Sequence, residues 1–190
     1  MKLNEYFSDL DRAFEEAKNP TDAVYMEAYM RNKFRFLGIR APLRKTLATP
    51  FFLKSIRPPE SSLKECVSVL WKSPWREMQF VGMELVSKYK NELDAGYFEL
   101  FEFMIVNKPW WDTVDYIAAT LVGNLFLRFP EEGFRYIEKW RKSKNIWLIR
   151  TCIIFQLKYK EKIDEALLFS LIIENRQQND LFIRKAIGWS

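Results

Sequence analysis

The chain has 190 residues, 48% of them hydrophobic and 29% charged, with a net charge of +5 at pH 7 and a pI of about 9.1. This length suffices for one domain with a substantial core, and the composition is ordinary for a globular protein. The absence of histidine excludes the Ser-His and Cys-His catalytic schemes and most zinc sites. With only six glycines, the chain has few of the turns that an all-β protein needs, so an all-α fold is favoured.

The first third of the chain is expected to hold three helices. Apolar residues three or four positions apart over residues 3–18 predict an amphipathic helix that stops before Pro20. Thr21 or Asp22 is expected to cap a second helix, which runs to about residue 30. A connection containing glycine follows, and Pro42 is well placed to open the third helix.

Cellular location is inferred from what the sequence lacks. The acidic, amphipathic N-terminus is unlike a signal peptide, and the longest apolar runs are far shorter than a membrane span. The two cysteines, Cys66 and Cys152, lie in apolar helical runs and are expected to be buried free thiols. No disulfide framework is implied, so we expect a cytoplasmic protein of bacterial type associated with the nucleoid, without membrane, metal or cofactor.

The chain becomes repetitive after residue 59. Trp75, Trp111 and Trp147 are 36 residues apart, and a further step reaches Ile183. Each tryptophan opens an apolar helix, and a second helical stretch follows each of these helices, at residues 95–106, 130–142 and 164–175. Two helices per repeat indicate an α-solenoid of HEAT-like helical hairpins. We predict a single repeat domain over residues 1–190, truncated in its last repeat, with the tryptophan-opening helices lining one curved, concave surface.

Two charged residues stand out on these helices. Asp115 lies four residues after Trp111, so the carboxylate and the indole share one helical face. Arg150 lies within an apolar run of the next repeat. The two side chains could form a structural ion pair between repeats or part of a functional site, and the residues alone leave both interpretations open. The 36-residue step gives Asp115 only uncharged counterparts, at Gln79, Thr151 and Ile187.

Longer matching stretches give the chain a family resemblance. Residues 29–39, 110–115, 147–150 with 155–160, and 182–189 resemble, in order, the AlkD family of DNA alkylation-repair glycosylases, which consist of HEAT-like repeats. The resemblance implies a DNA glycosylase that hydrolyses the N-glycosidic bond of N3- and N7-alkylated, cationic purines in duplex DNA without deep base flipping. By residue-to-residue match it assigns the active cleft to five side chains: Asp115, Trp111, Trp189, Arg150 and Tyr29.

The implied chemistry suits these residues. A purine alkylated at N3 or N7 carries a positive charge and leaves as a neutral base, so no general acid is needed. Asp115 could stabilise the developing oxocarbenium ion and orient water. The expected phosphate contacts on a basic groove are Arg76, Lys158, Arg184 and Lys185. We expect a monomer, and two alternatives remain: a non-catalytic repeat protein that binds DNA, and a scaffold for other proteins.

Overall fold

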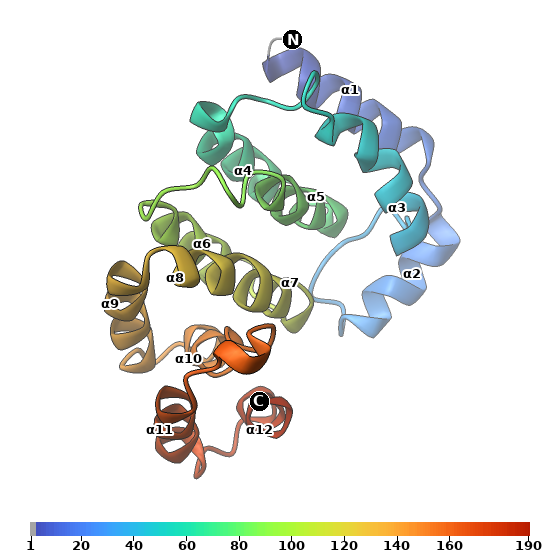
Figure 1. Cartoon of the computed structure of the whole chain (residues 1–190). Helices are drawn as coiled ribbons and strands as arrows, with labels where there is room; N and C mark the ends of the chain where they lie inside the picture. The colour runs from blue at the N-terminus through green and yellow to red at the C-terminus, as the bar shows by residue number, and fades with distance from the viewer. Residues whose placement is uncertain (1–2) are drawn as a thin grey trace. The chain divides into compact units, whose positions relative to one another are not determined.

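The computed structural model describes residues 3–190, and within that range the chain is helical and forms no β-strand, which confirms the all-α prediction (Figure 1). The residues form two compact units, one ending at Lys88 and the other running from Tyr89 to Ser190. Each unit consists of helices packed as hairpins, as an α-solenoid requires.

The first unit holds helices α1 to α5. Their bounds are α1 Leu3–Glu16, α2 Pro20–Tyr29, α3 Ala41–Ala48, α4 Leu63–Lys72 and α5 Arg76–Ser87, with short 3-10 turns at Thr49–Phe52 and Glu60–Ser62. The prediction for α1 is confirmed, because its apolar stripe buries Tyr6, Leu10 and Phe14. The predicted caps of α2 were wrong. The Asn19 side chain accepts from the N–H groups of Thr21 and Asp22, since it sits one residue before the Pro20 that opens the helix.

A buried carboxylate organises the centre of this unit. Glu77 of α5 accepts hydrogen bonds from three consecutive backbone N–H groups, those of Leu37, Gly38 and Ile39, at 3.0–3.1 Å. Burial raises the pKa of Glu77, and these backbone N–H groups oppose that rise. Gly38 has a φ of +87°, and a Cβ there would lie 1.9 Å from the Asn19 carbonyl oxygen, so only glycine fits. Glu77 thereby fixes the loop against which α2 begins.

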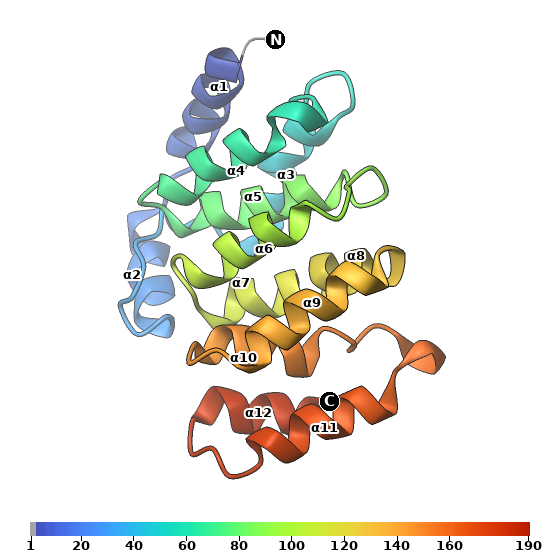
Figure 2. The ribbon, with the colours of Figure 1, turned by 90° about the vertical axis from the view of Figure 1, so that its left-hand side faces the viewer.

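The second unit holds the helices from α6 onward. Its elements are α6 Tyr97–Val106, α7 Trp111–Tyr116, the π-helix η3 Ile117–Val122, α8 Gly123–Arg128, α9 Pro130–Arg141, α10 Ile146–Ile154, the 3-10 turn η4 Lys160–Lys162, α11 Glu165–Asn175 and α12 Leu181–Trp189. Helix α10 packs against both α7 and α12, so the predicted neighbourhood of these three helices is confirmed (Figure 2).

The period of the repeat differs from the tryptophan spacing. Helices α5, α7, α10 and α12 begin at positions 76, 111, 146 and 181, which are 35 residues apart each time. Trp75 is therefore the N-cap of its helix, Trp111 is the first residue of its helix and Trp147 is the second residue of its helix. The prediction that the three tryptophans occupy equivalent positions was wrong. With a step of 35 residues, the counterparts of Asp115 are Phe80, Arg150 and Lys185. The prediction that all its counterparts are uncharged was therefore wrong.

Both cysteines are buried free thiols, as predicted. Burial raises the pKa of Cys66 to about 11 and that of Cys152 further still, so neither is a reactive thiolate at neutral pH. Over residues 3–190, no helix is long and apolar enough to cross a bilayer. The same residues contain no cluster of three or more side chains that could hold a metal ion.

Candidate active site

Asp115 lies near the end of α7, where the helix changes character. The next six residues form the π-helix η3, in which the Gly123 N–H bonds to the Ala118 carbonyl five residues back. Such π-helical turns are rare and frequently mark functional sites. The Asp115 side chain is 25% exposed, so its carboxylate can meet both solvent and a ligand although its helix belongs to the core.

Arg150 of α10 holds this carboxylate from the side of the core. Its Nε and Nη2 donate to Oδ1 and Oδ2 of Asp115 at 2.7 Å each, which is a bidentate ion pair. The two residues are 35 positions apart, so equivalent positions of adjacent repeats meet. Arg150 is 1% exposed, and its Nη1 donates to the carbonyl oxygen of Phe182. The guanidinium therefore orients Asp115 and ties α7, α10 and α12 together.

One tryptophan ring contacts the ion pair, and a second tryptophan opens the helix that carries Asp115. The Arg150 guanidinium lies 5.1 Å from the centre of the Trp189 ring, and Trp189 is 54% exposed. Trp111 is half-buried and opens α7 one turn before Asp115. Four of the five predicted cleft residues thus belong to the second unit, on α7, α10 and α12.

Three further rings support α7, α10 and α12 from inside. Trp110 and Trp147 are buried, and both contact the ring of Phe182 with centroid distances of 5.0 and 4.8 Å. The centroids of Trp110 and Trp147 are themselves 5.7 Å apart. The sequence interpretation of Trp110 and Trp147 as packing residues is consistent with this cluster. Because Phe182 also supplies the carbonyl that Arg150 binds, the cluster places that acceptor.

The other predicted residues have different environments. Tyr29 is the last residue of α2 in the first unit and is 70% exposed. Arg184 and Lys185 are exposed on α12. Lys158 is exposed, with its Nζ 2.7 Å from the Thr120 hydroxyl oxygen and 5.9 Å from the Tyr116 ring centre. These positions leave the ammonium and guanidinium groups accessible to phosphate.

Arg76 is a correction to the predicted DNA-contacting set. Its side chain is 0% exposed, and its guanidinium lies 3.8 Å from the centre of the Phe34 ring. A cation stacked on an aromatic ring and shielded from solvent cannot also pair with an external phosphate. The sequence suggested otherwise because Arg76 opens a tryptophan-marked helix, where the first turn was expected to face the concave surface.

One supporting feature was missed by sequence reasoning. The Tyr159 hydroxyl donates to the Gly123 carbonyl at 2.7 Å, where the π-helix returns to α-helix. A Cβ on Gly123 would lie 2.5 Å from the Phe155 carbonyl oxygen, so the backbones approach too closely for any other residue. A glycine inside an apolar helical pattern was the available signal for such a close approach.

The arrangement suits electrostatic stabilisation of a cation. A carboxylate held at both oxygens by a buried guanidinium is fixed in orientation, and the Asp115 side chain is still 25% exposed. The guanidinium that holds it lies 5.1 Å from the centre of the half-exposed Trp189 ring, whose π face also favours cations. A site with this composition can hold a water molecule and stabilise positive charge in a transition state.

Comparisons with known proteins place the chain in a family. It matches the family model described as "DNA alkylation repair enzyme" over residues 10–190. It is similar to a solved structure of a predicted DNA alkylation repair enzyme from Enterococcus faecalis, at 31% identity and a TM-score of 0.83, over 90% of this chain and 80% of that one. A comparison with curated proteins gives no match. With a family match covering most of its length, and with its helices arranged as in that relative, the chain belongs to the DNA alkylation repair enzyme family.

Proposed function

We propose that the protein is a DNA glycosylase that releases N3- and N7-alkylated purines from duplex DNA by hydrolysing the N-glycosidic bond. The observation that carries this proposal is the partly exposed Asp115 carboxylate, fixed by the bidentate Arg150 guanidinium beside the Trp189 ring. Membership of the DNA alkylation repair enzyme family supports an alkylated DNA substrate.

The reaction needs little from the protein. Alkylation at N3 or N7 makes the purine cationic, so the C1′–N bond breaks with the electron pair going to the base, which leaves neutral. Positive charge moves to the deoxyribose, where an oxocarbenium ion develops. Asp115 is assigned to stabilise that charge and to orient the water molecule that adds to C1′. No proton donor to the base is required, which agrees with a chain that has no histidine.

The remaining residues have assigned roles in the same scheme. Trp111 and Trp189 would pack on the deoxyribose and backbone of the alkylated nucleotide through their π faces. Arg150 is a positioning residue for Asp115, because it is buried and its guanidinium donates to protein oxygens. Lys158, Arg184 and Lys185 would contact phosphates, and Tyr29 of the first unit keeps the contact with alkylated DNA that the family resemblance implies. Since no base has to enter a pocket, a shallow site suffices.

The proposal is tested by incubating the protein with a duplex that contains 7-methylguanine and then cleaving abasic sites with alkali. Wild-type protein should produce cleavage at the modified base and none in the unmodified duplex. Asp115→Asn should remove most of the activity and leave DNA affinity nearly unchanged. Asp112→Asn, on the same helix, is the matched control, because Asp112 lies in the first turn and its Oδ1 accepts from the Thr113 N–H. Equal base release by wild type and Asp115→Asn would show that the catalytic assignment is wrong.

A non-catalytic DNA-binding role is the alternative. It predicts binding with a steep salt dependence and no base release from any alkylated duplex. The same assay separates the two functions.

A further inference from the structure

Helix α2 turns its more apolar face outward. Val24, Tyr25 and Tyr29 are 66%, 69% and 70% exposed, and no residue of the helix is buried. The exposed residues fall on one side of the helix and form what we call the α2 stripe: Thr21, Val24, Tyr25, Ala28 and Tyr29. The opposite side, which is half-buried, carries Asp22 and Glu27. Such an inverted pattern is unexpected for a helix that only packs on its own core, and an exposed apolar patch of this kind marks an interaction site.

The stripe is presented by a firmly attached helix. The Asp22 carboxylate accepts two hydrogen bonds from the Arg40 guanidinium, at 2.9 and 2.6 Å. The Glu27 carboxylate accepts from the Phe36 N–H at 3.1 Å. Both acidic side chains of α2 are therefore engaged, and the start of the helix packs against the loop that Glu77 holds. The outward face needs little ordering when a partner binds.

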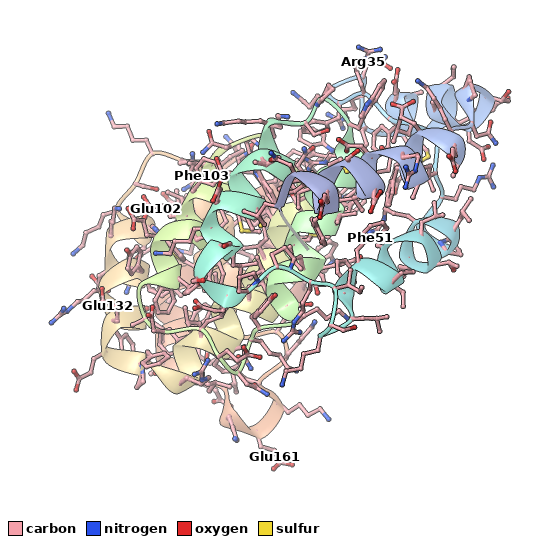
Figure 3. The ribbon with its side chains drawn as sticks, turned by 90° about the horizontal axis from the view of Figure 1, so that it is seen from above. Arg35, Phe51, Glu102, Phe103, Glu132 and Glu161 are labelled. Atoms are coloured by element: carbon pink, nitrogen blue, oxygen red, sulfur yellow. The ribbon has the colours of Figure 1, made fainter. Side chains whose placement is uncertain are left out.

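Cationic side chains follow the stripe in the chain. Arg31, Lys33 and Arg35 are exposed; Arg35, labelled in Figure 3, has its guanidinium 4.7 Å from the centre of the Trp75 ring. Arg31 and Asn32 have positive φ values of 56° and 54°, a conformation that non-glycine residues seldom adopt. Two consecutive residues in this conformation make a tight turn, which brings the cations back beside the C-terminal end of α2.

The charge and the aromatic content favour one kind of partner. Exposed tyrosines followed by exposed cations suit a nucleic acid, because rings pack on sugars and bases while Arg and Lys pair with phosphates. Tyr25 lies one helical turn, about 6 Å, before Tyr29 on the same face. Both acidic side chains of α2 are engaged with the protein, whereas the three cations that follow the helix are exposed, and this excess of positive charge favours a polyanion.

We propose that the α2 stripe is a DNA-contact surface, in which Tyr25 is a further contact residue and Arg31 pairs with a phosphate. Tyr25 packs on the sugar and backbone of a nucleotide of the duplex. The inference rests on the proposed function for its choice of duplex DNA. It concerns binding outside the Asp115 site, so it can be tested without catalysis.

The test measures fluorescence anisotropy of a labelled, unmodified duplex with the full chain. Tyr25→Ala should raise Kd about tenfold, near the low end of the effects of removing an aromatic stacking residue. Tyr25→Phe should keep the wild-type Kd, because the ring makes the contact. Phe169→Ala is the matched control, since Phe169 is 57% exposed on α11, away from any proposed contact, and its Kd should stay within about twofold. Circular dichroism checks that each variant is folded.

A second variant tests the cation. Arg31→Gly removes the charge and suits the backbone, because glycine adopts a φ near 56° without strain. The slope of log K against log salt should fall in magnitude by about 0.9, the value for one phosphate contact on duplex DNA.

The outcomes separate this inference from the proposed function. A tenfold loss for Tyr25→Ala in a protein that releases no alkylated base would support the α2 surface and refute the glycosylase. Wild-type affinity in both Tyr25→Ala and Arg31→Gly would overturn the α2 surface even in an active glycosylase, and would turn attention to a protein partner. A wild-type chain that binds no duplex would overturn it as well.

Discussion

The substitution Arg150→Lys distinguishes an orienting residue from a phosphate contact. Arg150 is 1% exposed, and its guanidinium donates to both oxygens of Asp115 and to the Phe182 carbonyl. An ammonium group keeps the charge but cannot reproduce the planar fork that binds a carboxylate at two points. In this variant, Asp115 should still have a positive charge beside it, but its carboxylate should be free to rotate.

The magnitude follows from the bonds that are lost. Removing one partner of a buried ion pair costs about 3–5 kcal/mol, and a charge-assisted hydrogen bond contributes about 1.5–3 kcal/mol. Because the variant keeps the charge and Asp115 is 25% exposed, we expect the free energy of unfolding to fall by about 2–3 kcal/mol. Loss of orientation should slow base release about 100-fold, which corresponds to about 2.7 kcal/mol of activation free energy.

Single-turnover base release and duplex affinity over a range of salt concentrations provide the assay. Base release should slow, whereas Kd and its salt dependence should match those of the wild type, because Arg150 is shielded from solvent. An unchanged rate together with a salt slope reduced by about 0.9 would instead identify Arg150 as a phosphate contact and contradict its orienting role.

Further predictions concern the support of the site and of α2. Glu77→Gln should lower the free energy of unfolding by about 1–3 kcal/mol, because an amide leaves one of the three backbone N–H donors without an acceptor. Because burial raises the pKa of Glu77 in the folded state, the contribution of this proton to stability is largest at low pH and is lost as pH rises through that pKa. Glu77→Gln should flatten this part of the plot of unfolding free energy, measured by urea denaturation, against pH. Gly123→Ala should destabilise by about 1–3 kcal/mol, because its Cβ would lie 2.5 Å from a backbone oxygen. Gly188→Ala, which meets nothing within 4 Å, should be neutral or stabilising by up to about 1 kcal/mol in the same melts, and equal effects at the two glycines would contradict the close approach. Trp189→Ala should slow base release about tenfold and change stability by about 1 kcal/mol or less, because the ring is 54% exposed over Arg150; a large loss of stability would instead assign it to packing.

The helical architecture could be predicted from the sequence because the apolar period and the proline positions determine it locally. The repeat was visible as well, but the tryptophans gave its length as 36 residues. The helix starts give 35, and the one-residue difference decides which residues are equivalent. In the correct register Asp115 and Arg150 occupy matching positions, so their pairing is a direct consequence of stacking adjacent repeats.

Other parts of the site could not be predicted because they depend on tertiary contacts. Arg76 is 0% exposed, and the Phe34 ring that its guanidinium stacks on comes from a loop about 40 residues earlier in the chain. The π-helix after Asp115 has no local sequence signature. Gly123 indicates that another segment packs closely against it, but the sequence does not show that this segment is the backbone at Phe155. Arg150 can be identified as an orienting residue only from its burial and from its hydrogen bond to the Phe182 carbonyl. Neither feature follows from helical periodicity.

The most direct measurement of the central claim is the single-turnover rate of 7-methylguanine release from a duplex, with enzyme in excess, for wild type and Asp115→Asn. Removing one electrostatic stabiliser of a transition state typically costs 10²–10³ in rate. We predict a ratio of about that size with Kd for the duplex changed less than about threefold, since Asp115 contributes no attraction to phosphate. A ratio near one, measured on variants that are equally folded, would contradict the assignment of Asp115 as the catalytic carboxylate.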